Sequence, residues 1–163
     1  MSVFTRFMTG LALATALVMA ADRTGFDGKW MLDKSGSTGD EPVPLNLLQK
    51  VKTNGSEIRV ESTFAEPANG VAPLLYVGIM ANSLALSTDG SEKQNQIGPF
   101  QQASKTTIDG TTMTTEWTAV IKGEAVNGKW VRTLDPDGRH MTLEIQESSK
   151  GEDHHATLKF RRK

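Results

Sequence analysis

The chain has 163 residues, with 18 Lys and Arg against 19 Asp and Glu, and it contains no cysteine. This length suits one domain, and the near-neutral charge gives the chain no electrostatic reason to bind nucleic acid. Without cysteine, a disulfide scaffold, a thiolate metal site, a cysteine nucleophile and a lipid-modified cysteine are all excluded.

Residues 1–20 predict a secretory signal peptide. Arg6 supplies a positive charge, residues 7–20 form a short apolar stretch, and Ala20 ends a run suited to cleavage. An uncleaved membrane anchor is the alternative, but a spanning helix needs about 20 apolar residues, and this stretch is shorter. We therefore expect a signal peptide over 1–20 and a mature domain over 21–163. The mature domain would be periplasmic or secreted, with no membrane contact after cleavage.

Seven Asn-Gly or Asp-Gly dipeptides punctuate the chain. Tight hairpin turns need positive φ, which these residues tolerate and most others do not. Runs of about strand length, rich in Thr, Val, Ile and Trp, lie between the dipeptides. The pattern predicts one antiparallel β domain built from hairpins.

In chain order, the first expected strand covers residues 28–32, and a polar loop containing Gly and Pro follows over 33–44. The clearest hairpin pairs residues 45–52 with 57–64 across Asn-Gly. Residues 71–80 form the most apolar internal stretch. Periodicity does not decide whether this stretch is a buried strand or a short helical lid.

A short strand around residues 84–86 precedes a second polar loop over 91–102. We expect a turn over 123–128, and further strands at 103–108, 111–121, 130–134, 140–147 and 155–162. Neighbouring strands follow one another in the chain, and a long exposed sheet edge invites aggregation. The sequence thus predicts an all-β fold, an antiparallel up-and-down β-barrel of eight to ten strands, with a two-sheet sandwich as the alternative.

The start of the first strand carries a family resemblance. Phe26-x-Gly28-x-Trp30 resembles the Gly-x-Trp signature of the lipocalins and their calycin relatives, and residues 130–143 look like paired strands of small secreted bacterial lipocalin-like proteins. The resemblance implies a cup-like barrel with Gly28 and Trp30 at its closed end and a late basic side chain over the indole. Arg161, next to Arg162 in the last strand, is assigned to that position, and a solvated basic tail is the alternative.

Catalytic patterns are missing from the sequence. It contains no nucleophile elbow, phosphate loop or dinucleotide fingerprint. His154 and His155 are adjacent, and adjacent strand residues point to opposite faces, so the two do not share one ion. We expect no enzyme activity, no cofactor and no metal site.

The barrel interior is the expected functional site. A barrel of eight strands has room for packed side chains or for one small ligand, and the Thr-rich arms favour an incompletely filled interior. We expect the cavity to be lined by Phe64, Tyr76, Trp117 and Met141. Arg132 would bind a ligand carboxylate if it faces inward, and would pair with Glu116 on the surface if it faces outward.

The leading functional hypothesis is non-catalytic binding or carriage of a small, largely apolar molecule inside the barrel. The alternative is a protein-interaction module, such as an inhibitor or an envelope partner, that uses the loops over 33–44 and 91–102. The sequence does not indicate an oligomeric state.

Overall fold

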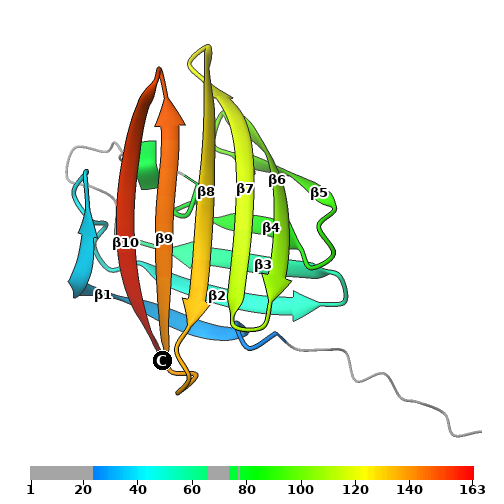
Figure 1. Cartoon of the computed structure of the whole chain (residues 1–163), viewed down its shortest axis with the longest axis vertical. Coiled ribbons are helices and arrows are strands. Elements are labelled where there is room, and N and C mark those ends of the chain that lie inside the picture. Colours follow the sequence, from blue (N-terminus) through cyan, green and yellow to red (C-terminus); the bar gives the residue numbers. More distant parts are fainter. Residues whose placement is uncertain (1–23, 66–73, 77) are drawn as a thin grey trace, which may run out of the picture.

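The computed structural model describes residues 24–65, 74–76 and 78–163 (Figure 1). The predicted signal peptide lies outside these residues. No helix among them is both long enough and apolar enough to cross a bilayer. The described elements are β1 (Gly28–Gly39), β2 (Leu48–Asn54), β3 (Glu57–Thr63), the 3-10 helix η1 (Leu74–Tyr76), β4 (Ser83–Ser87), β5 (Glu92–Ile97), β6 (Phe100–Asp109), β7 (Thr112–Ile121), β8 (Glu124–Leu134), β9 (His140–Ser149) and β10 (Glu152–Arg162).

The strands form one antiparallel sheet in the order β4-β3-β2-β1-β10-β9-β8-β7-β6-β5. All neighbours are consecutive in the chain except β1 and β10, whose pairing joins the first strand to the last. In Figure 1 the strands β6 to β10 stand upright in front, and β2 to β4 cross behind them. The sheet therefore curls into a nearly closed barrel, which confirms the predicted all-β up-and-down architecture.

A side chain closes the seam between β4 and β5. The backbone N–H of Ala85 on β4 donates to Oδ1 of Asn95 on β5 at 2.7 Å, and Nδ2 of Asn95 donates to the Ala85 carbonyl at 3.0 Å. The same Nδ2 donates to Ser104 Oγ at 3.3 Å. The amide of Asn95 thus satisfies backbone groups that a neighbouring strand would otherwise pair.

The closed end of the barrel contains Trp30, which is fully buried and donates from Nε1 to the Phe26 carbonyl at 2.8 Å. Arg162 covers the indole, with its guanidinium carbon 4.5 Å from the ring centroid, and donates from Nη2 to the Gly25 carbonyl at 2.7 Å. The expected residue, Arg161, is exposed and pairs with Met31 instead. Alternation along β10 gives the covering position to Arg162, so the assignment of Arg161 is wrong.

Both predicted loops are largely strands. Residues 33–39 continue β1, where the register with β10 shifts between Asp33 and Thr38, and most of 91–102 belongs to β5 and β6. The sequence shows no apolar alternation over β5, because this strand is exposed on one face and carries the polar Asn95 on its buried face. Of the two recognition loops in the alternative hypothesis, residues 40–44 remain outside the strands, whereas most of 91–102 belongs to strands.

The expected turn over 123–128 is also misplaced. The hairpin turns at Lys122 and Gly123, both with positive φ, and β8 already begins at Glu124. Gly128 lies inside β8 under the ring of Trp117, where a Cβ would come within 2.5 Å of Trp117 Cε2. This glycine therefore makes room for an indole and does not form a turn.

Candidate functional site: the barrel interior

Arg132 is the largest charged side chain inside the barrel. It is fully buried on β8, between Met113 of β7 and Leu143 of β9, and no described residue accepts a hydrogen bond from any of its three guanidinium nitrogens. Its guanidinium carbon lies 5.8 Å from the ring centroid of Trp130. Burial lowers the pKa of Arg132 to about 10, so the group stays charged at neutral pH. Buried charges in proteins are normally paired, so this position suits an anion.

One indole, that of Trp130, lies beside the guanidinium, and a second, that of Trp117, lies beside Trp130. The rings of Trp117 and Trp130 are 5.6 Å apart at 41°, and both Nε1 atoms are buried without a hydrogen-bond partner among the described residues. Trp130 lies against Gly78, where a Cβ would overlap the ring. Two glycines, Gly78 and Gly128, thus allow both rings to pack inside the barrel.

Glu147 is the second charged group of the interior. It is fully buried near the end of β9, and neither carboxylate oxygen has a partner in the described part of the chain. Burial and the nearby Glu41 raise the pKa of Glu147 to about 7, while His154 acts in the opposite direction. The carboxyl group is therefore partly protonated at neutral pH.

Residues 74–76 and 78–81, here called the plug segment, belong to the buried core of the barrel. Leu75, Tyr76, Ile79 and Met80 are buried, and η1 packs against β9 and β10. The Ile79 carbonyl accepts from Gln49 Nε2 at 3.0 Å and from a serine hydroxyl at 2.9 Å. The described part of 71–80 is thus a short 3-10 turn inside the barrel and not a strand.

Contacts with the loop after β1 hold the plug segment at its start. Tyr76 Oη donates to the Glu41 carbonyl at 3.0 Å, and the Leu75 N–H donates to the Glu41 carboxylate at 3.2 Å. Burial, with Glu41 and Asp40 nearby, raises the pKa of Tyr76 to about 12. The tyrosine is therefore a neutral hydrogen-bond donor at any physiological pH.

The described residues line one small pocket inside the barrel. The enclosed pocket that residues such as Gly78, Phe100, Gln102 and Trp117 line has a volume of about 10 Å³, close to that of one water molecule. This described pocket is too small for the ligand that an incompletely filled interior would hold. Of the threonines, Thr106 and Thr115 face inward, where their hydroxyls bond each other at 2.9 Å.

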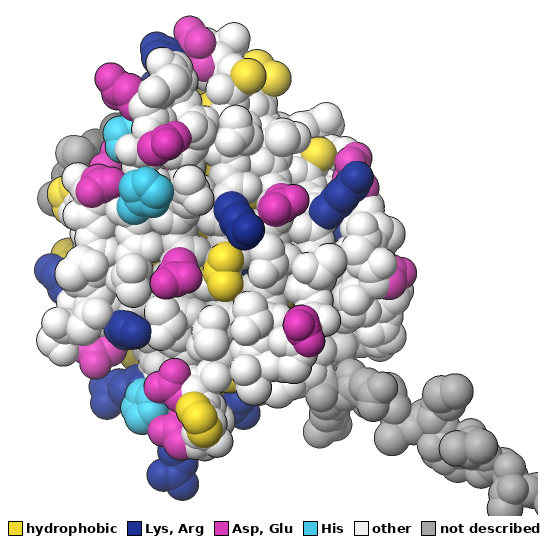
Figure 2. Space-filling view, viewed as in Figure 1, with side chains coloured by type: hydrophobic (Ala, Val, Ile, Leu, Met, Phe, Trp, Pro, Cys, Tyr) yellow, Lys and Arg dark blue, Asp and Glu magenta, His cyan; other side chains and the backbone are white. Residues whose placement is uncertain are grey.

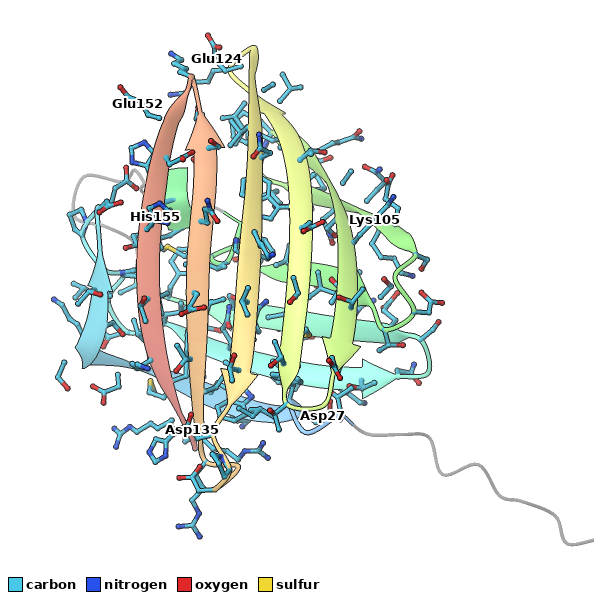
Figure 3. The ribbon with its side chains drawn as sticks, in the orientation of Figure 1. Asp27, Lys105, Glu124, Asp135, Glu152 and His155 are labelled. Atoms are coloured by element: carbon cyan, nitrogen blue, oxygen red, sulfur yellow. The ribbon has the colours of Figure 1, made fainter. Side chains whose placement is uncertain are left out.

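The outer face carries a larger but shallower hollow of about 670 Å³ over β6 to β9, which side chains such as Lys105, Glu116 and Lys129 line. Figure 2 shows acidic and basic side chains interspersed over this face, and Figure 3 shows Lys105 and His155 on the same outer side. Glu116 Oε1 lies 3.9 Å from Lys129 Nζ on this outer face. Arg132 is fully buried on the other face of the sheet, so the alternative in which it pairs with Glu116 on the surface is wrong. In the described ranges, no group of three or more His, Cys, Asp or Glu could hold a metal ion.

The expected site residues lie in different parts of the barrel. Trp117 and Arg132 lie on either side of Trp130, and Tyr76 belongs to the plug segment. Met141 is buried next to the closed end, and Phe64 is only half-buried beyond β3.

Sequence reasoning missed Glu147. The alternation of Met141, Leu143 and Ile145 continues to this residue and could have placed it inside the barrel.

Comparisons with known proteins identify the fold and no closer relationship. No family model matches the sequence, and no curated protein matches it. Three solved structures are similar with a TM-score of 0.54: the fatty acid transporter REP1-NXSQ, a secretory abundant heat soluble protein from Ramazzottius varieornatus, and zebrafish ileal bile acid-binding protein complexed with cholic acid. Their identities to this chain are 12%, 12% and 13%. They cover 84%, 88% and 86% of it, and 95%, 98% and 100% of their own chains are matched. At these identities the likeness shows a calycin-like β-barrel fold.

Proposed function

We propose that this protein binds or carries, without catalysis, a small and largely apolar molecule with an acidic group, held inside the barrel by Arg132. One observation carries the proposal: Arg132 is fully buried, and none of its guanidinium nitrogens is paired by a described residue. A guanidinium binds a carboxylate through two parallel hydrogen bonds, which suits a planar anion better than water. Leucine, isoleucine and methionine side chains around it would contact the apolar part.

The similar structures support the same chemical class. One is described as a fatty acid transporter, and another contains cholic acid. Both kinds of molecule combine a carboxyl group with a large apolar body. The support is analogy of fold, and the chemistry of Arg132 makes it specific to this chain.

Ligand entry would require the plug segment to move. Binding pockets for small molecules usually measure about 300–1,000 Å³, whereas the interior pocket that the described residues line measures about 10 Å³. Ile79 and Met80 pack into the barrel without a strand of their own, so an apolar ligand could replace them against the same walls. The binding affinity would then be reduced by the free energy needed to displace these side chains.

The proposal includes a location outside the cytoplasm. Its support is the pattern of residues 1–20, with Arg6 before a short apolar stretch. To test it, the full chain is expressed and the secreted or periplasmic fraction is analysed by mass spectrometry, which should find a chain without residues 1–20. An uncleaved chain that stays in the cytoplasm would reject this part of the proposal.

Fluorescence titration tests the binding function. Trp130 lies next to Arg132 and Trp117 next to Trp130, so fatty acids or apolar fluorophores that enter the interior should change tryptophan emission in a saturable way. Arg132→Met should weaken binding of a carboxylate ligand at least tenfold, because the charge-assisted hydrogen bonds are lost. Arg139→Met, at an exposed turn, is the matched control and should bind normally. No saturable response to any apolar acid would reject the proposal.

A further inference from the structure

Glu147 is a second charged residue of the interior, on a different strand from Arg132. Its side chain is fully buried, and both carboxylate oxygens lack a partner among described residues. Leaving a carboxyl group in this state costs free energy, because burial removes its hydrogen bonds to water. The position is therefore suited to a group that donates hydrogen bonds.

Trp117 points toward the same place. Trp117, Gly128 and Glu147 are neighbours in one row across β7, β8 and β9. Gly128 has no side chain, and Nε1 of the indole lies 2.6 Å from where its Cβ would be. The N–H edge of Trp117 thus extends over β8 toward β9, whose backbone is about 5 Å further along the row. A hydrogen-bond donor and a carboxyl group therefore lie in one row of the inner wall, and neither has a partner among the described residues.

We propose that Glu147 and Trp117 form a second binding subsite, which accepts a hydrogen bond from a hydroxyl or ammonium group of the ligand and donates one to it. The inference rests on the proposed function, since Arg132 would hold the acidic end of the same molecule. The ligand class is then an apolar chain or ring system with an acidic group at one end and an O–H or N–H donor at the other.

The strand register sets the spacing between the two subsites. Arg132 pairs with Leu143, and Glu147 follows four residues later on β9. Four residues of a strand span about 13 Å. A C–C bond of about 1.5 Å at an angle of about 111° advances about 1.25 Å along an extended chain, so about twelve carbons cover roughly the same distance.

The charges around Glu147 separate hydroxyl from ammonium ligands. Glu41, in the loop after β1, raises the pKa of Glu147, and His154, its neighbour on β10, lowers it. Tyr76 of the plug segment is neutral, and its hydroxyl is bound to the Glu41 carbonyl. An ammonium group should therefore bind better as the carboxyl group of Glu147 ionises above pH 7, while a hydroxyl group should bind with little dependence on pH.

Calorimetric titration of the wild-type protein with dodecanoate, 12-hydroxydodecanoate and 12-aminododecanoate gives the test. At about pH 8.5 we expect the hydroxy acid to bind about tenfold more tightly than dodecanoate, as one buried hydrogen bond predicts. The amino acid stays protonated at this pH, because its amine has a pKa near that of lysine, about 10.4. It should bind more tightly at about pH 8.5 than at about pH 6.

Two variants assign the effect to Glu147. Glu147→Gln keeps a carbonyl acceptor, so the hydroxyl preference should stay within about threefold while the ammonium ligand loses at least tenfold. Glu147→Leu should make dodecanoate the preferred ligand, and Gln146→Leu on the exposed face is the control.

The possible results separate the two proposals. If dodecanoate binds most tightly to wild type and to Glu147→Gln alike, the subsite is refuted and the proposed function stands. If none of the three ligands binds, the proposed function fails. The wild-type ranking decides the question even if Glu147→Leu does not fold.

Discussion

Replacing Arg132 by methionine should make the protein more stable while removing the proposed anion site. The guanidinium is fully buried without a described partner, so the folded state holds a desolvated charge that the unfolded chain exposes to water. Methionine has a similar length and no charge. Replacing buried ionic groups by apolar residues of similar volume often stabilises proteins by about 1–4 kcal/mol.

The pKa of Arg132 sets the size of the effect. Burial lowers it from 12.5 to about 10, and one unit corresponds to about 1.4 kcal/mol, so the charge destabilises the fold by about 3 kcal/mol at neutral pH. Methionine is somewhat smaller, and the space left unfilled offsets part of the gain, which leaves about 2 kcal/mol. For a domain of this size, the melting temperature should rise by roughly 4–8 °C.

Urea unfolding and calorimetry of wild type, Arg132→Met and the control Arg139→Met measure this change. Dodecanoate should raise the melting temperature of wild type and leave that of Arg132→Met unchanged, since a ligand stabilises only the state that binds it. A loss of about 3–5 kcal/mol in Arg132→Met would refute the reasoning, because this is the result of breaking a buried ion pair. It would mean that Arg132 has an anionic partner within the chain.

Three other substitutions test the interior and the seam. The pKa of Glu147 is raised from 4.5 to about 7, so the folded state keeps a proton that the unfolded chain loses, and stability falls as pH rises through this window. Glu147→Gln should remove this dependence, about 3 kcal/mol between about pH 4.5 and 8 in urea titrations, and equal slopes in both proteins would contradict it. Asn95→Ala should cost about 2 kcal/mol and speed amide exchange at Ala85, whereas unchanged exchange would show that the seam closes without Asn95. Gly128→Ala should cost about 1–3 kcal/mol and change the near-UV circular dichroism of Trp117, and a neutral result would mean that the ring moves freely aside.

Local patterns predicted the fold well because the turn dipeptides sit where hairpins form. Gly55, Gly90, Gly110 and Gly138 all have positive φ between paired strands or at strand ends, as the dipeptides required. Gly128 belongs to the same pattern but lies under a ring. A glycine that makes a turn and a glycine that admits a neighbour have the same sequence signature, and only the partner strand distinguishes them.

The site was predicted less well than the fold, because a polar residue in a strand is usually exposed. Arg132 has the parity of Trp130 and Leu134, both buried, and that parity indicates an inward position. Its charge argued for the surface. The plug segment was unpredictable for another reason: its place depends on Ile79 bonding to Gln49 and on Tyr76 bonding to Glu41, contacts between residues about 30 positions apart.

The distribution of satisfied and unsatisfied polar groups argues that the interior polarity serves binding. Where polar side chains support the fold, the barrel pairs them: Thr106 bonds Thr115 at 2.9 Å, and Asn95 makes three hydrogen bonds at the seam. Most of the buried polar atoms without a described partner belong to four residues instead, namely Trp117, Trp130, Arg132 and Glu147. Each buried polar group without a partner reduces stability. If these groups had no common role, we would not expect them to lie together on one stretch of the inner wall. Their clustering on β7 to β9 is what the proposed binding of a bipolar apolar molecule would require, at the expense of stability.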